Sequence, residues 1–302
     1  MRFLKGQNYG NIILLVATLL LSCSGGADKS MDLEDPTDIY TIIKEDSTSG
    51  IDIVSAEGSD PIEVRKQIAA FEIPEQTYEK KRAMLYSLLD RLYELGDSSG
   101  GKISYLIDSL NYMTVHYLQN ILLDKKSLTH PLQHKMLKSV ASFDKIIRVY
   151  SWKDNLGVDL HLMLNVIQYQ CQDSGLRTLF MSEIADNEDV DFACSRVQSI
   201  YKLKSEASNS LYLFNFMGNR GGKKNFKGST IVEIVDDYLE FDYKAFEGID
   251  EYYVLKYAEG EDVTVSFSPK TDILQYVFKN SEWTQKIRFV FDGQTFRKEK
   301  TE

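Results

Sequence analysis

Apolar residues recur every three or four positions across residues 61–142, which is the spacing of an amphipathic helix. One apolar stripe follows Pro74 and stops at Gly96, and a second follows Gly101 and runs to Ile121. The short glycine turn between them predicts that the two helices pair as an antiparallel hairpin or bundle. The N-terminal part of the folded chain, residues 61–142, is therefore expected to be helical.

From residue 143 to residue 302 the hydrophobic period changes to two, and β-branched and aromatic residues become frequent. Val263, Val265 and Phe267 alternate with Thr264 and Ser266, which predicts a strand with one buried face and one solvated face. The predicted strands are 145–152, 159–170, 176–184, 196–204, 210–217, 230–236, 252–257, 263–268, 274–278 and 286–291.

Short connections separate most of these strands, and short connections favour antiparallel pairing. A turn at Asp292 and Gly293, between two phenylalanine-rich segments, predicts a hairpin. The pattern predicts an α+β protein in which a helical part precedes a mostly antiparallel β domain. A sandwich, a barrel and a partial propeller all fit this pattern.

The N-terminus has the layout of a secretory signal, with a basic start at Arg2 and Lys5 and an apolar run from Ile12 to Leu21. The run is about half the roughly 20 residues that a spanning helix needs. Residues 1–22 are therefore expected to be removed. Ser22 and Cys23 then match the small residue and cysteine of a lipoprotein cleavage site, so Cys23 is the predicted lipid attachment point.

Residues 23–60 are polar and acidic, with ten Asp or Glu residues, and predict a flexible tether between the lipid and the folded part. Removal of residues 1–22 deletes Arg2 and Lys5 and no acidic residue, so the formal charge changes from −10 to −12. Nucleic acid is excluded as a partner on this balance, because phosphate binding depends on Lys and Arg. The predicted membrane contact is through the lipidated Cys23.

Three further segments of the chain are informative: residues 144–152, which end in Tyr150, Ser151 and Trp152, residues 165–169, and residues 289–296. Together with the lipoprotein cleavage site and the helical N-terminal part, they resemble uncharacterised lipoproteins of Bacteroides-type bacteria. The relatives carry a glycine-rich turn after Trp152, where this chain has Lys153 to Gly157. The resemblance implies a cell-envelope location, attached to the outer membrane on its periplasmic or surface face, and implies no activity.

No cofactor or metal site is predicted. His130 and His134 are four residues apart, near a short helix expected to begin at Pro131, but Pro131 stands where a zinc protease would carry its glutamate. No catalytic residue is assigned either, because the chain has no nucleophile elbow and no thiol signature around Cys171.

Two groups of residues are candidates for ligand contact. Trp152 and Trp283 offer flat aromatic rings on which a sugar can stack. Positive charge is concentrated in one predicted hairpin tip, where an anionic sugar, a lipid headgroup or a protein partner would be attracted. The four basic residues of this tip are Arg220, Lys223, Lys224 and Lys227.

After Cys23, only Cys171 and Cys194 remain. In an oxidising compartment such a pair permits a disulfide, and two buried thiols on neighbouring strands are the alternative.

Three functions stay open on the sequence. The leading hypothesis is a non-enzymatic binding or scaffolding module that takes a glycan or an envelope protein. The first alternative is a hydrolase that cleaves polysaccharide through paired carboxylates. The second is a structural subunit of an envelope assembly.

Overall fold

A computed structural model describes residues 77–98, 104–155, 162–171, 175–181, 195–205, 209–219, 225–241, 243–248, 252–258 and 260–299. The predicted signal sequence, Cys23 and the predicted tether lie outside these residues. The chain divides into two compact units, one ending at Ile121 and one beginning at Leu122.

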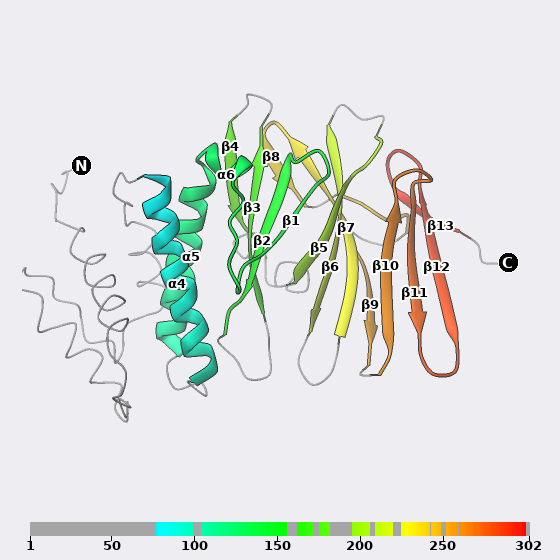
Figure 1. The fold of residues 1–302 in the computed structure, drawn as a ribbon. Coiled ribbons are helices and arrows are strands. Elements are labelled where there is room, and N and C mark those ends of the chain that lie inside the picture. The colour runs from blue at the N-terminus through cyan, green and yellow to red at the C-terminus, as the bar shows by residue number, and fades with distance from the viewer. Residues whose placement is uncertain are drawn as a thin grey trace, which may run out of the picture. The chain divides into compact units, whose positions relative to one another are not determined.

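The first unit contains two long helices, α4 (Tyr78–Ser98) and α5 (Ser104–Leu122), the latter ending one residue past the boundary (Figure 1). Each buries an apolar stripe, with Leu85, Leu88 and Leu92 on α4 fully buried. The Lys81 ammonium, near the start of α4, donates to the Asn120 side chain near the end of α5, at 2.6 Å. Both helices agree with the sequence prediction, and the turn between them lies outside the described residues.

The short helix expected at Pro131 is a wrong prediction. A four-residue helix, α6 (Lys126–Thr129), ends before Pro131, and the chain continues without regular structure to strand β1 (Lys138–Ala141). Strand structure therefore begins inside the segment that was predicted to be helical.

The second unit is built from three sheets of antiparallel strands. Sheet A has the order β1-β2-β3-β4, sheet B has β5-β6-β7-β8 with β9 also paired to β7, and sheet C has β10-β11-β12-β13. The mostly antiparallel β structure is thereby confirmed. None of the three described sheets closes on itself, so the barrel alternative is wrong. The other bounds are β2 (Ile147–Lys153), β3 (Met163–Gln170), β4 (Leu176–Phe180), β5 (Arg196–Lys202), β6 (Ser210–Asn219), β7 (Asn225–Val235), β8 (Tyr238–Glu240), β9 (Tyr252–Tyr257), β10 (Asp262–Ser268), β11 (Ile273–Lys279), β12 (Thr284–Phe291) and β13 (Phe296–Lys298).

Sheet B lies between sheets A and C, in the left-to-right order of Figure 1. Strand β6 shows why: Leu211 and Leu213 belong to the core shared with sheet C, whereas Tyr212 and Phe214 belong to the core shared with sheet A. Because successive side chains of a strand point to opposite faces, a strand in the central layer must be apolar at nearly every position.

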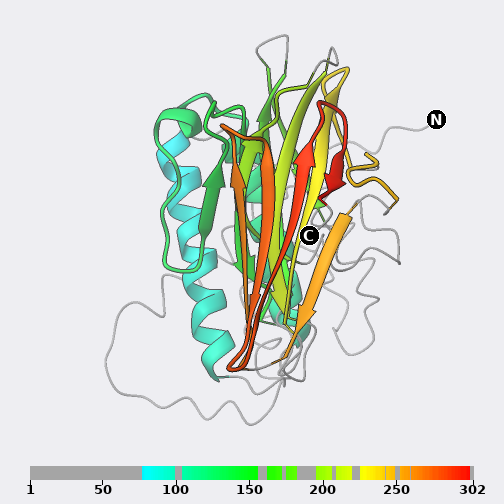
Figure 2. The ribbon, with the colours of Figure 1, turned by 90° about the vertical axis from the view of Figure 1, so that its right-hand side faces the viewer.

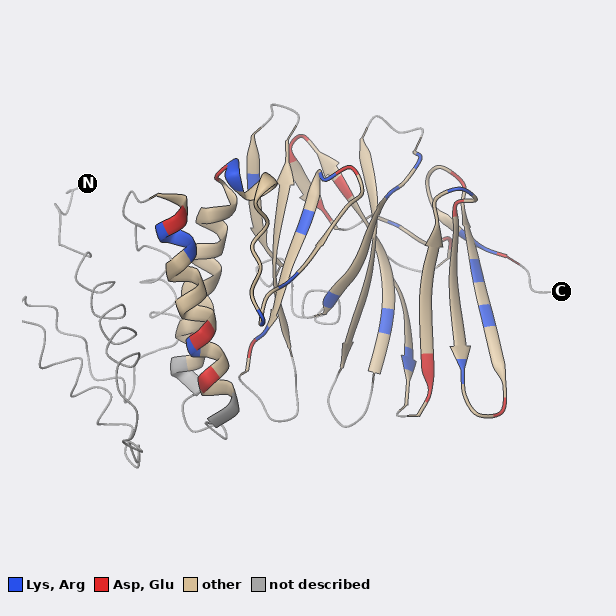
Figure 3. Ribbon diagram, viewed as in Figure 1, with Lys and Arg blue, Asp and Glu red and all other residues tan. Residues whose placement is uncertain are grey.

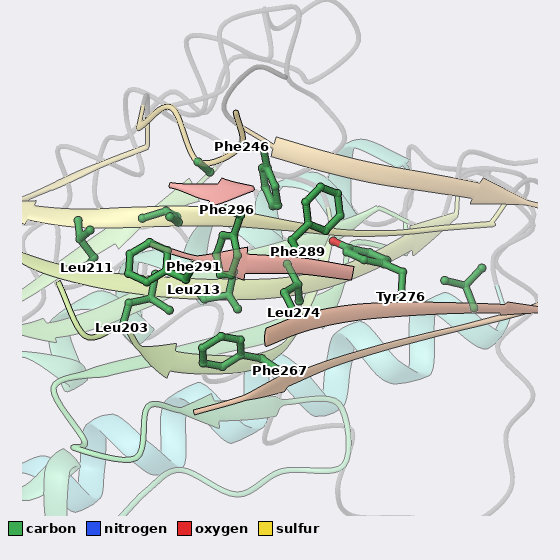
Figure 4. Packing of buried hydrophobic residues seen from close by; sticks show 13 residues of the cluster. Leu203, Leu211, Leu213, Phe246, Phe267, Leu274, Tyr276, Phe289, Phe291 and Phe296 are labelled. Carbon is green, nitrogen blue, oxygen red and sulfur yellow. The ribbon is translucent and has the colours of Figure 1, made fainter. Parts of the chain in front are cut away.

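The core between sheets B and C is rich in aromatic rings (Figure 4). Phe289 of β12 lies at its centre, with ring centroids 5.2 Å from Phe246 and 4.8 Å from Tyr253. Beside the rings, the Tyr276 hydroxyl donates to Ser229 Oγ, which donates to Asn215 Oδ1, each at 2.6 Å. The polar atoms of this buried row are thus paired across the two sheets.

Asp144, in the turn between β1 and β2, connects sheet A to sheet B. Its carboxylate accepts hydrogen bonds from Ser142 Oγ at 2.6 Å, from the Ile146 N–H at 3.2 Å and from the Tyr212 hydroxyl at 2.9 Å. Lys202 Nζ lies 3.5 Å away. Burial alone raises the pKa of Asp144, but these hydrogen bonds and the Lys202 charge outweigh it and hold the pKa below its usual value.

Asp144→Asn is expected to lower the free energy of unfolding at neutral pH by about 1–2 kcal/mol. Because the folded pKa is depressed, the contribution of the carboxylate is complete above the unfolded pKa of about 3.9 and disappears as the pH falls through the lower folded value. Denaturant unfolding at neutral and acidic pH measures both effects. Asp236→Asn, an equivalent change in another turn, is the control; equal losses for the two variants would contradict the assignment.

Candidate ligand-binding site

Trp283 lies in the tip of the hairpin between β11 and β12. Its ring stacks on Phe278 of β11, with centroids 4.9 Å apart and planes 13° apart, and 46% of the residue is exposed. Asn280 fixes the turn, because its side-chain oxygen accepts the N–H groups of Glu282 at 2.9 Å and Trp283 at 2.8 Å. Phe278 covers one face of the indole, so the exposed area includes the opposite face.

The same end of sheets B and C carries Lys227 and Tyr257. Lys227 Nζ donates to the Val263 carbonyl, lies 3.7 Å from Asp262 Oδ1 and sits 5.8 Å from the centre of the Tyr257 ring. Burial and the Asp262 charge raise the pKa of Tyr257, which keeps its hydroxyl protonated and able to donate. Lys227 is only 15% exposed, so it acts first as a connection between the two sheets.

Strand pairing places these residues at one end. Asn225 pairs with Tyr257, Asp262 pairs with Lys279, and Lys279 pairs with Thr284, directly after Trp283. We call the group formed by Lys227, Tyr257, Asp262, Phe278 and Trp283 the B–C rim. The hairpin between Asn219 and Asn225 emerges at this end, and its predicted basic residues Arg220, Lys223 and Lys224 lie outside the described residues.

Trp152 does not join the rim. It lies on β2 of sheet A and has no exposed surface. A fully buried ring offers no face to a ligand arriving from solvent, so its burial removes Trp152 from the contact residues. The alternating pattern around Trp152 predicts a strand, but it does not say whether the sheet face that carries Trp152 is covered.

His130 and His134 lie after α6 and outside the strands that form the rim. His130 Nδ1 lies 2.9 Å from Thr129 Oγ1, and His134 Nδ1 accepts the Met136 N–H at 3.3 Å. Because α6 ends at Thr129, the two rings do not share a helix face. Within the described ranges, no group of three or more His, Cys, Asp or Glu residues is placed to hold a metal ion.

Cys171 is buried directly after β3, at the end of sheet A where Arg177 and Asp237 meet. Arg177 Nε donates to the Cys171 sulfur at 3.0 Å, and the sulfur lies 3.7 Å from the Asp237 carbonyl oxygen.

Cys194 lies outside the described residues, so its disulfide with Cys171 stays a prediction.

The B–C rim combines a flat apolar face with a hydroxyl group and charged groups, which is the composition that suits a sugar ring. Sequence reasoning had identified Trp283 and Lys227 but missed Tyr257, Asp262 and Phe278. The signal for Phe278 was available, since a hairpin tip of four residues between Lys279 and Thr284 places Trp283 beside the end of β11.

No family model, curated protein or solved structure matches this chain. Among the described helices, none is both long enough and apolar enough to span a bilayer.

Proposed function

We propose that the chain is a lipid-anchored cell-envelope protein that binds glycans without cleaving them. Residues 1–22 are removed, Cys23 carries the lipid, and residues 23–60 hold the folded part away from the outer membrane, on its periplasmic or surface face. The uncharacterised envelope lipoproteins that the sequence resembles support this location. Within the folded part, the B–C rim is the ligand site.

The exposed Trp283 ring carries the binding proposal. A large aromatic side chain costs free energy when it meets water, yet this one is held by the stack on Phe278 and by the Asn280 turn. A fixed ring loses little conformational freedom when a ligand stacks on it, so binding is favoured. The Tyr257 hydroxyl of the rim can donate a hydrogen bond to a sugar hydroxyl, and so can the amide of Gln285, which pairs with Phe278 across β11 and β12.

Trp283→Ala is expected to reduce glycan affinity at least about tenfold, because truncation of an aromatic residue that dominates a binding site costs about 2 kcal/mol or more. The measurement is titration of the mature chain carrying Cys23→Ser against polysaccharides selected on a glycan array. Trp283→Tyr, which keeps a ring, should retain most of the affinity.

Phe143→Ala serves as the control, because Phe143 is an exposed aromatic residue in the turn between β1 and β2, away from the rim. Unchanged binding by Trp283→Ala would remove the rim from the proposal. Products are followed in the same wells; product formation that disappears on a single carboxylate substitution would favour the hydrolase alternative instead.

The anchoring proposal has its own test. Cys23→Ser should abolish incorporation of labelled palmitate and shift the protein from the membrane fraction to the soluble fraction. Retention of the label by this variant would contradict lipidation at Cys23.

The exposure of Phe143 favours a second function, as a structural subunit of an envelope assembly. This side chain is 98% exposed, although its turn is fixed by Asp144, Ser142 and Ile147. A rigid exposed aromatic residue is typical of the residues that dominate protein interfaces. Crosslinking in intact envelopes tests this: a crosslinked partner lost on Phe143→Ala supports the assembly role, and an unchanged pattern opposes it.

A further inference from the structure

Sheet C has one face that no described element covers (Figure 2). Its inward residues, such as Leu274, Tyr276 and Phe289, are buried in the core shared with sheet B. Because side chains alternate along a strand, the residues between them point outward. This outer face is a second surface, which adjoins the B–C rim where Asp262 pairs with Lys279.

The outer face repeats one chemical pattern in two consecutive rows across β10, β11 and β12. The register aligns a hydroxyl residue on β10, a central residue on β11 and a cation on β12. Rows on one face are separated by two residues, which is about 7 Å along a strand. The rows are Thr264, Val277 and Lys286, followed by Ser266, Gln275 and Arg288.

Positive charge on this face is only partly balanced. Neither Lys279 nor Lys286 has an acidic group of the described chain within 4.0 Å, whereas Arg288 Nη1 lies 3.0 Å from Glu299 Oε2. Figure 3 shows the basic positions along β12. This face is therefore more basic than the chain as a whole, which has a formal charge of −10. A repeated cation beside a repeated hydroxyl matches a polymer that carries regularly spaced anions among hydrogen-bonding groups.

We propose that the outer face of sheet C binds an anionic polysaccharide laid along its strands. Carboxylates of the polymer pair with Lys279, Lys286 and Arg288, and its hydroxyl groups exchange hydrogen bonds with Thr264 and Ser266. The hydrophobic residues of the face, Ile273, Val277 and Val290, are half-buried, so the face lacks the exposed apolar anchors that insertion into a bilayer or a stable protein interface uses.

The test compares polygalacturonate with its methyl-esterified form, because the two share a backbone and differ in charge. The mature chain carrying Cys23→Ser should prefer polygalacturonate, and the preference should decline as sodium chloride is raised. Lys279→Gln with Lys286→Gln should weaken this binding about five- to tenfold. Glu299→Gln should strengthen it about two- to threefold, because it releases Arg288 from its ion pair.

The matched control is Lys125→Gln with Lys126→Gln, the same charge change at exposed positions by α6. The proposal is overturned by equal affinity for the two polymers, by equal losses in the two double variants, or by binding to phosphatidylglycerol vesicles or to a second copy in place of the polymer. Trp283→Ala separates this result from the B–C rim: if it alone removes binding and charge has no effect, the rim proposal stands and this one fails.

Discussion

Phe289→Ala is expected to lower the free energy of unfolding by about 3–5 kcal/mol, the largest loss we anticipate for a single side chain. The ring lies at the centre of the core between sheets B and C, in contact with Phe246, Tyr253 and Tyr276. Its removal leaves a cavity bordered by rings that are fixed by several neighbours and cannot collapse into the space. Denaturant unfolding followed by circular dichroism measures the loss.

Phe143→Ala is the matched control, because it deletes the same ring from a position that is 98% exposed. It should change stability by less than about 0.5 kcal/mol. Similar losses for the two variants would mean that sheets B and C do not share the core described above.

Gly228→Ala is expected to cost about 1–3 kcal/mol, toward the upper end of that range. Gly228 of β7 lies directly opposite Phe216 of β6, whose ring covers it. A methyl group there would lie 2.4 Å from the Phe216 ring and 2.8 Å from the Tyr253 carbonyl oxygen. The ring can turn aside, but the oxygen belongs to the paired strand β9 and cannot move without breaking the ladder.

Gly218→Ala provides the comparison. The three atoms nearest to a methyl group at Gly218 all belong to the Phe226 ring, the first at 2.3 Å, and a ring can turn aside, so this variant should lose less stability than Gly228→Ala. Phe216→Leu should also cost less in the Gly228→Ala background than alone, since it relieves part of the clash. Thermal unfolding of the four variants measures these losses. If the losses of Gly228→Ala and Phe216→Leu simply add in the double variant, the proposed clash is contradicted.

Strand type was readable from the sequence wherever alternation was strong. The segment 263–268 was predicted as a strand and is β10 (Asp262–Ser268), since its valines and Phe267 face the core while its hydroxyl residues face water. By contrast, β7 starts at Asn225, five residues before the predicted start at 230. Lys227 and Gly228 have little intrinsic strand preference, and their strand conformation comes from pairing with β6 and β9.

The position of sheet B as the central layer could have been predicted from β6. Its residues from Leu211 to Phe216 form a mostly apolar run without alternation, and the structure buries all six. Such a run indicates a strand covered on both faces and hence a central sheet. Strand β1 had no comparable signal, because it is short and mostly exposed, and only its register with Arg148 to Ser151 defines it.

The B–C rim was predictable only in part, because the sequence does not show which aromatic side chains are covered. Trp283 and Trp152 are one residue type in similar strand-rich surroundings, but one projects from a hairpin tip and the other is enclosed. Exposure of a tryptophan depends on what covers its face of the sheet, and that covering comes from residues distant in the chain.

Strand β10 forms one edge of sheet C, and an uncapped edge invites the strands of other molecules to extend the sheet into a fibril. Two lysines work against this. Lys227 of β7 donates to the Val263 carbonyl at one end of β10, and Lys204, two residues after β5, donates to the Pro269 carbonyl just past the other end. An arriving strand would have to displace both ammonium groups and would meet Asp262 beside one of them. Molecules held on one membrane by the proposed lipid anchor would collide often, and these two side chains would help to keep them separate.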